Sequence, residues 1–297
     1  MIESIKELKK ICQNSKAETM DWYSKIFYRN ISVYLTKLLL HTSITANHVT
    51  LFTIVLGLAA GILFSFGTYS YILAGALLLQ LWLIFDCVDG EIARYRGTAG
   101  ICGKYIESLD HCITEPFTVV CVGYGLYVLL DVVSIFVLGV LVALFMVWSS
   151  SSANLVYCVI FVAGMHDMGD MVSRYRFYEG KGAAYKISTI RHIYNSYIKF
   201  PTTPTSFTVF LLLLTVLDIL FINFCPDFSA GSLTLIFGPD TDVIYISGIF
   251  DHGLHFNFLY IYFLFFSIVS IIRGIVKIHN NFQGVCRYQQ DAKQQQS

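Results

Sequence analysis

The residues with the clearest chemical potential are carboxylates at the end of an apolar run, where a membrane helix would meet water. Asp86 and Asp89 follow the run Tyr71–Phe85 directly. If this segment is helical, Gly90 and Ala93 lie on the same face as the two aspartates, because the spacings are i, i+3, i+4 and i+7. Small residues on that face allow a ligand to lie against the helix backbone.

A second polar group follows after a short gap. Glu107 and His111 are four residues apart and share one face of the next predicted helix, and Gly103 precedes them. Three acidic oxygen donors and an imidazole, on two helices near one membrane surface, indicate a site for a divalent cation and a phosphate group.

Together the two groups resemble the signature of the CDP-alcohol phosphotransferase family, Asp-x2-Asp-Gly-x2-Ala-Arg-x8-Gly-x3-Asp-x3-Asp. The matching residues are Asp86, Asp89, Gly90, Ala93, Arg94, Gly103, Glu107 and His111. Glu107 and His111 stand where the family has its third and fourth aspartates. Upstream, Thr45-Ala46-Asn47-His48-Val49-Thr50 is similar to the Thr-Pro-Asn-x-x-Thr that opens the family's first membrane helix.

This resemblance implies a membrane enzyme of phospholipid or headgroup biosynthesis. Such an enzyme transfers a phosphatidyl or phosphoalcohol group from a CDP-activated donor to a hydroxyl acceptor and releases CMP. The resemblance also implies Mg²⁺ or Mn²⁺ as cofactor, held by Asp86, Asp89, Glu107 and His111. The nucleotide and substrate contacts that it implies are Asn47, Thr50, Gly90, Ala93, Arg94 and Gly103. Arg94 is expected to pair with the β-phosphate or with a metal-binding carboxylate.

His111 occupies the place of the aspartate that activates the acceptor hydroxyl in the family. Imidazole is a competent general base, and its ordinary pKa of about 6.5 is closer to neutral pH than that of an aspartate. As a metal ligand, imidazole favours Mn²⁺ over Mg²⁺. Two alternatives stay open. Asp110 assists through a local twist of the helix, or Glu107 and His111 mark a chain that binds CDP ligands without reacting them.

Composition predicts an all-α integral membrane protein, because 56% of the residues are hydrophobic and only 13% are charged. Several apolar runs have about 18 residues or more, which is enough to cross a bilayer core. We expect an N-terminal segment 1–48, a six-helix catalytic domain 49–280 and a cytosolic tail 281–297. The expected spans are 49–67, 70–90, 105–130, 132–163, 204–225 and 255–278.

Basic residues predict the orientation of the six spans. All 20 Lys and Arg lie on one side of this arrangement, which the positive-inside rule assigns to the cytosol together with both termini and the site. Arg174, Arg176 and Arg191, between the fourth and fifth spans, are candidates for binding an acceptor's phosphate, or are topogenic charge alone. Nucleic acid is not expected as a partner, because no soluble basic domain is present to hold it.

Residues Met20–Leu40 predict an amphipathic helix in the headgroup plane, before the first span. Its polar side carries Lys25, Arg29, Ser32 and Thr36, and its cations are expected to face anionic lipid. Packing of this helix on the cytosolic rim of the bundle is compatible with that placement. Asn47 suits either an N-cap of the first span or a ligand contact. Glu91 fills a variable position of the signature, so it should face away from the nucleotide, and Glu91→Gln should have a mild effect.

Two further features concern the interior of the bundle. Asp218, within a span, is expected to form an interhelical hydrogen bond or to snorkel. Gly57 and Gly61 allow close helix packing, either within the bundle or between the protomers of a homodimer. A small transporter is the second functional class, although transport sites usually lie near the bilayer midplane and these carboxylates lie at one edge.

Overall fold

The chain is mainly helical in the residues that the computed structural model describes, which are 3–13, 24–163, 204–224 and 257–296. No strand occurs among them, so the predicted all-α class is confirmed. The chain divides into two compact units, Met1–Val140 with Pro204–Leu264 and Leu141–Thr203 with Phe265–Ser297. The elements are α1 (Ile5–Gln13), η2 (Ser24–Tyr28), α2 (Arg29–Leu40), α3 (Ala46–Ser65), α4 (Tyr69–Tyr95), α5 (Ile101–Leu130), α6 (Val133–Ala163), α9 (Pro204–Phe224) and α11 (Phe258–Gln296).

Membrane-length helices dominate this list. Those long and apolar enough to cross a bilayer are Ala46–Ser65, Tyr69–Tyr95, Ile101–Leu130, Val133–Ser152 and Phe258–Gln283. A shorter apolar helix, Ser206–Phe221, stands in the place of the fifth predicted span. These helices support the predicted multi-pass membrane protein, while the side on which each terminus lies stays a prediction. α11 continues to Gln296, so residues 281–296 of the predicted tail extend the last helix.

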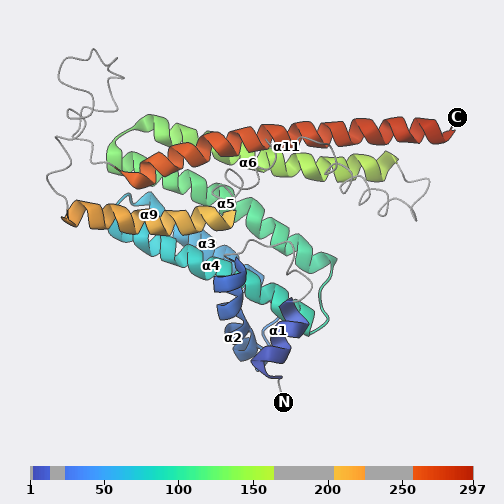
Figure 1. Ribbon diagram of the computed structural model, residues 1–297, viewed down its shortest axis with the longest axis horizontal. Coiled ribbons are helices and arrows are strands. Elements are labelled where there is room, and N and C mark those ends of the chain that lie inside the picture. The colour runs from blue at the N-terminus through green and yellow to red at the C-terminus, as the bar shows by residue number, and fades with distance from the viewer. Residues whose placement is uncertain (1–2, 14–23, 164–203, 225–256, 297) are drawn as a thin grey trace, which may run out of the picture. The chain divides into compact units, whose positions relative to one another are not determined.

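In the first unit α3 packs against both α4 and α5, and the three helices lie side by side in Figure 1. The close approach of α3 to α5 depends on two glycines. A Cβ atom at Gly57 would lie 2.1 Å from Cγ2 of Thr114, and one at Gly61 would lie 2.6 Å from Cε1 of Phe117. The glycine pair therefore serves packing within the bundle, which is one of the two roles predicted for it.

The ends of the spanning helices are set by local sequence. Thr45 is the N-cap of α3, because its hydroxyl accepts the N–H of His48 and the His48 side chain accepts the N–H of Thr45. The N-cap role predicted for Asn47 is therefore wrong. Gly97, between α4 and α5, has φ 65°, a left-handed conformation that glycine adopts without a steric cost.

Asp218 joins α9 to the start of α11. It is 1% exposed, and its carboxylate accepts the backbone N–H groups of Phe258 and Leu259 at 2.8 and 3.0 Å. Helix-opening N–H groups have no partner within their own helix, so the carboxylate supplies the missing acceptor. The predicted interhelical hydrogen bond is confirmed. In the second unit, Asn281 of α11 donates to the Ser152 hydroxyl of α6 at 3.0 Å.

α2 turns its polar side inward, contrary to the prediction. Arg29, Ser32 and Thr36 are buried, with at most 6% of each residue exposed. The outer side of η2 and α2 is instead apolar and exposed, through Ile26, Phe27, Ile31, Tyr34 and Leu38. The helix is amphipathic as predicted, but the side that contacts protein carries Arg29, Ser32 and Thr36 together with Val33, because α4 offers the polar groups a buried acceptor.

That acceptor is Glu91, which is only 1% exposed. Its carboxylate accepts hydrogen bonds from the Ser32 and Thr36 hydroxyls and from the Gln13 side-chain amide, each at 2.7 Å. Glu91 thus fastens both N-terminal helices to α4. It does not line the hollow described below, so it faces away from the site as predicted.

Replacing Glu91 is expected to destabilise the protein, whereas the mild effect predicted from sequence concerned the activity of Glu91→Gln and stays a prediction. Glu91→Ala removes the acceptor of three hydrogen bonds, and each buried donor left without a partner costs roughly 1–3 kcal/mol. We expect a clear drop in the thermal unfolding midpoint of the purified protein in detergent, with Glu91→Gln intermediate. Lys10→Ala, at an exposed position of α1, is the control and should leave the midpoint nearly unchanged. Equal midpoints for the two alanine variants would contradict the fastening role.

α1 is held in place by hydrogen bonds to its backbone carbonyls, which come from Arg29 and Arg94, and by its buried side chains. Leu8 and Cys12 are fully buried in a cluster with Val33 of α2. Burial raises the pKa of the Cys12 thiol to about 11, so this cysteine is a packing residue and not a nucleophile.

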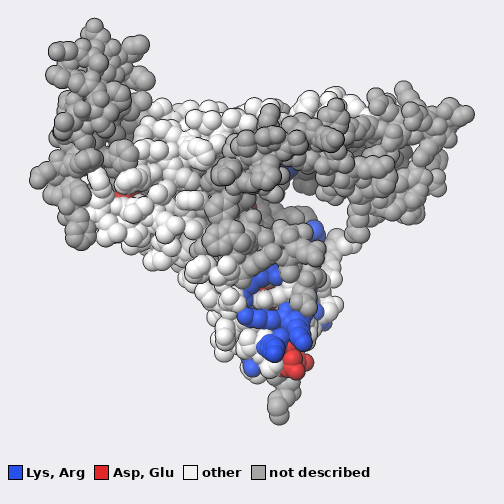
Figure 2. Space-filling view, viewed as in Figure 1, with Lys and Arg blue, Asp and Glu red and all other residues white. Residues whose placement is uncertain are grey.

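Figure 2 shows Lys and Arg side chains gathered over the end of the first unit that α1 and α2 form. A basic end of this kind is the feature from which a cytosolic side was predicted.

Candidate active site

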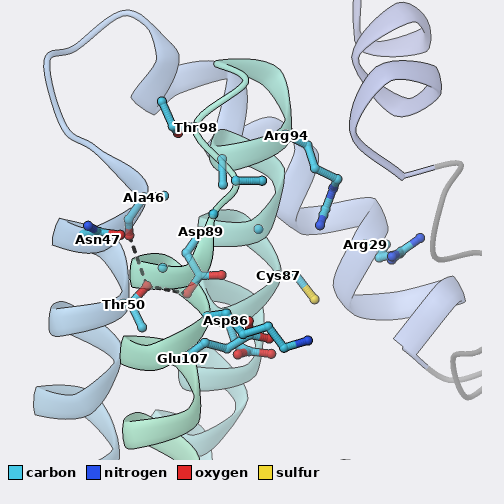
Figure 3. A pocket seen from close by; sticks show the side chains of 16 residues that line it. Arg29, Ala46, Asn47, Thr50, Asp86, Cys87, Asp89, Arg94, Thr98 and Glu107 are labelled. Carbon is cyan, nitrogen blue, oxygen red and sulfur yellow. Dashed lines mark hydrogen bonds between the residues drawn. The ribbon is translucent and has the colours of Figure 1, made fainter. Parts of the chain in front are cut away.

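A hollow of about 300 Å³ is formed by residues of α2, α3, α4 and α5 and of the turn between α4 and α5 (Figure 3). It is lined by Arg29, Ala46, Asn47, Thr50, Asp86, Cys87, Asp89, Gly90, Ala93, Arg94, Thr98, Ala99, Gly100, Gly103, Lys104 and Glu107. The lining includes all predicted nucleotide contacts and three of the four predicted metal ligands. The register of the signature, with its eight-residue gap across the α4–α5 turn, therefore brings these residues to one place.

Asp89 is held from the neighbouring helix. It is 7% exposed, and the Thr50 hydroxyl of α3 donates to its Oδ2 at 2.7 Å, as Figure 3 shows. Thr50 was predicted to contact substrate. The structure shows that it also holds in place a carboxylate at the wall of the hollow.

The three carboxylates of the hollow, Asp86, Asp89 and Glu107, have no ion pair with Lys or Arg among the described residues. Asp86 is paired with His111, and the described ion pairs at this site both involve that histidine. A buried carboxylate is costly unless it is paired or binds a metal. Three oxygen donors facing one hollow suit Mg²⁺ or Mn²⁺ in chemical type. Among the described residues, no three His, Cys, Asp or Glu side chains converge tightly enough to surround one ion, so the ligand set stays a prediction.

His111 is not among the lining residues and reaches the hollow through Asp86. Its Nε2 lies 3.5 Å from Oδ1 of Asp86, and its Nδ1 lies 2.9 Å from Oε1 of Glu115. The indole of Trp82 packs against the imidazole in an edge-on arrangement, with ring centroids 5.5 Å apart. The imidazole is therefore fixed on several sides next to a predicted metal ligand.

Asp110 points into the bundle, away from the hollow. It is 1% exposed, and its carboxylate accepts from the Thr114 hydroxyl at 2.7 Å, the Thr53 hydroxyl at 2.9 Å and the Trp82 indole N–H at 3.2 Å. With these donors in place, Asp110 joins α3, α4 and α5. The structure thus argues against the alternative in which Asp110 assists as the base.

Arg94 has two roles. Its Nε donates to the backbone carbonyl of Cys12, which ties α1 to the end of α4. Its other two nitrogens lie over Gly90, at 3.0 and 3.3 Å from where a Cβ atom would stand. Glycine at position 90 therefore leaves room for the guanidinium at the wall of the hollow. No ion pair links Arg94 to Asp86, Asp89 or Glu107 in the described structure.

Sequence reasoning missed two cations of the hollow and one carboxylate beside it. Arg29 was assigned to lipid, and Lys104 falls at a variable position of the signature, yet both line the hollow. Glu115 lies beyond the signature, although its spacing of four from His111 was a readable signal. The candidate acceptor-phosphate residues Arg174, Arg176 and Arg191 lie outside the described residues.

The geometry agrees with the comparison to known families. The family model described as CDP-alcohol phosphatidyltransferase matches residues 43–225. The chain belongs to this family. No curated protein gave a significant match. The match runs from just before the cap of α3 to the end of α9 and covers every lining residue of the hollow except Arg29, so it extends well past the signature.

Membership defines the reaction class. CDP-alcohol phosphatidyltransferases transfer a phosphate–alcohol group from a CDP-alcohol to an acceptor in lipid synthesis, within the membrane. The family generally uses divalent metal ions, which agrees with the carboxylates that line the hollow. The family match thus gives the class of reaction, and the role of each residue has to be inferred from the position of its side chain.

Proposed function

We propose that this chain is an active CDP-alcohol phosphotransferase, working at the cytosolic face of its membrane. It moves a phosphatidyl or phosphoalcohol group from a CDP-activated donor to a hydroxyl acceptor and releases CMP. The observation that carries the proposal is the cluster of Asp86, Asp89 and Glu107 around one hollow, with no Lys or Arg ion pair among the described residues and with His111 beside Asp86. A buried carboxylate such as Asp89 is costly to ionise without a partner charge, and a bound cation would supply that charge.

In the proposed reaction the acceptor oxygen attacks the phosphorus that carries the alcohol. The bond from this phosphorus to the oxygen of CMP breaks, and CMP leaves with the electron pair. The proton of the acceptor hydroxyl passes to Nε2 of His111, the ring nitrogen that faces Asp86. Transfer of this kind depends mainly on positioning and on electrostatic stabilisation.

The ligands proposed for Mg²⁺ or Mn²⁺ are Asp86, Asp89 and Glu107. The Thr50 hydroxyl holds the Asp89 carboxylate in position by a hydrogen bond. A bound divalent ion supplies neutralisation of the pyrophosphate charge and stabilisation of the CMP leaving group. Arg29, Arg94 and Lys104 line the same hollow and add positive charge for the phosphates. The wall of the hollow contains the small residues Gly90, Ala93 and Gly103, which leave space for a ligand to approach the helix backbone. Asn47 is proposed as a nucleotide contact.

The test is CMP release by the purified full-length protein. A panel of CDP donors, including CDP-diacylglycerol and soluble CDP-alcohols, is combined with alcohol and lipid acceptors in the presence of Mg²⁺ or Mn²⁺. Release that requires one donor, one acceptor and the metal would support the proposal. Metal-independent CMP release would contradict the assignment of the carboxylates.

A second candidate function has a specific observation behind it. Glu107 and His111 replace family aspartates, and His111 contacts Asp86 in place of a carboxylate. A chain that binds CDP ligands without turnover would show saturable, metal-dependent binding of a CDP donor but no CMP. Two further predictions concern the same purified protein. One is that it forms a homodimer, and the other is that an acceptor's phosphate binds to Arg174, Arg176 and Arg191.

A further inference from the structure

Glu115 is an ionisable residue well inside a membrane-length helix. It lies 14 positions after the start of α5, which corresponds to about 21 Å along the helix axis. Its side chain is 22% exposed, and Nδ1 of His111, one helical turn away, is 2.9 Å from its Oε1. An ionisable group within a span is expensive to keep there and usually has a role tied to its partner.

The geometry points to Glu115 as the positioning residue for His111. The carboxylate accepts the Nδ1 proton, which fixes both the tautomer and the rotation of the ring. Nε2 is then the nitrogen left to face Asp86, at 3.5 Å from its Oδ1. This inference rests on the proposed function, in which Nε2 takes the acceptor's proton, and it adds a residue that the signature does not contain.

A histidine base needs such a partner, whereas an aspartate base does not. Imidazole has two distinct nitrogens, and the one that is free to accept is decided by the hydrogen bond of the other. The edge-on packing of Trp82 limits tilting of the ring but does not choose the tautomer. Glu115 thus allows histidine to act as the base at a position where the family has a carboxylate.

A double-mutant cycle separates positioning from general support of the helix. Glu115→Ala should lower kcat roughly 10- to 100-fold, the usual effect of losing such a partner, with the KM for the donor nearly unchanged. In the His111→Asp background the same change should alter kcat by no more than about twofold, because no imidazole is left to orient. Glu115→Gln, whose amide oxygen still accepts the Nδ1 proton, should retain more activity than Glu115→Ala. Ile113→Ala, on the exposed side of α5, is the matched control.

The outcomes separate this inference from the proposed function. An equal loss on Glu115→Ala in both backgrounds would overturn positioning, because Glu115 would then act without His111. Wild-type turnover in His111→Ala would overturn the base itself. A readout without turnover uses ¹⁵N-histidine-labelled protein, with the His111 ring signals identified by their loss in His111→Asp. These signals should shift in Glu115→Ala and stay in place in Ile113→Ala, and unshifted signals in Glu115→Ala would overturn the inference.

Discussion

Replacing Asp89 with asparagine is expected to lower the rate of CMP release roughly 10²- to 10³-fold, the range seen when one electrostatic contact to a developing charge is removed. Asparagine keeps the shape and can still accept the Thr50 hydroxyl, so the fold should persist. The negative charge is lost, however, and with it one ligand for the divalent ion. The loss should therefore appear in catalysis and metal binding.

Thermal unfolding of the same variants tests this assignment independently. In the presence of a chelator, Asp89→Asn should be at least as stable as wild type, because it removes a buried charge that has no basic partner among the described residues. Added Mn²⁺ should raise the unfolding midpoint of wild type more than that of the variant, since a ligand stabilises the state that binds it. Asp131→Asn, at the exposed end of α5, is the matched control. Near-normal CMP release from Asp89→Asn at saturating metal would contradict the metal assignment.

The hollow could be predicted from sequence because it depends on spacing within and between two adjacent helices. The i, i+3, i+4 and i+7 positions of α4 fix one wall, and the eight-residue gap fixes where α5 returns. In the structure Asp86, Asp89 and Glu107 line one hollow, as these spacings predict. Long apolar runs likewise predict spanning helices with no knowledge of their packing.

The N-terminal helices could not be placed in this way. An amphipathic pattern gives two faces but does not say which of them meets protein. The polar face of α2 turns inward because Glu91, more than fifty residues away along the chain, accepts Ser32 and Thr36. Nothing local to α2 reveals that acceptor. For the same reason Arg29 was assigned to lipid, although it lines the hollow.

Alanine at position 111 is expected to lower turnover roughly 10²- to 10⁴-fold, the usual contribution of a positioned proton acceptor. Donor binding should stay close to normal, because His111 does not line the hollow and the lining residues remain. The measurement is kcat from CMP release, together with the Kd of the donor in the absence of acceptor. His279→Ala, at an exposed position of α11, is the control and should leave both values unchanged.

Aspartate at position 111 restores the residue that the family has there. His111→Asp should keep measurable turnover, because a carboxylate can take the proton directly and needs no partner to choose its tautomer. The oxygen donor added beside Asp86 should also move the metal preference from Mn²⁺ toward Mg²⁺, because Mg²⁺ prefers oxygen ligands. Activity ratios with the two metals, measured for wild type and His111→Asp side by side, report this shift.

The two substitutions at position 111 together decide between the two candidate functions. Turnover of His111→Ala equal to that of wild type would show that another group takes the acceptor's proton. The hydrogen bonds of Asp110 to Thr53, Trp82 and Thr114 make that carboxylate a poor substitute. If wild type releases no CMP with any donor but His111→Asp or Glu107→Asp/His111→Asp does, the natural chain binds CDP ligands without reacting them. Turnover in wild type that falls in His111→Ala and partly returns in His111→Asp would establish the histidine as the working replacement for the family's aspartate.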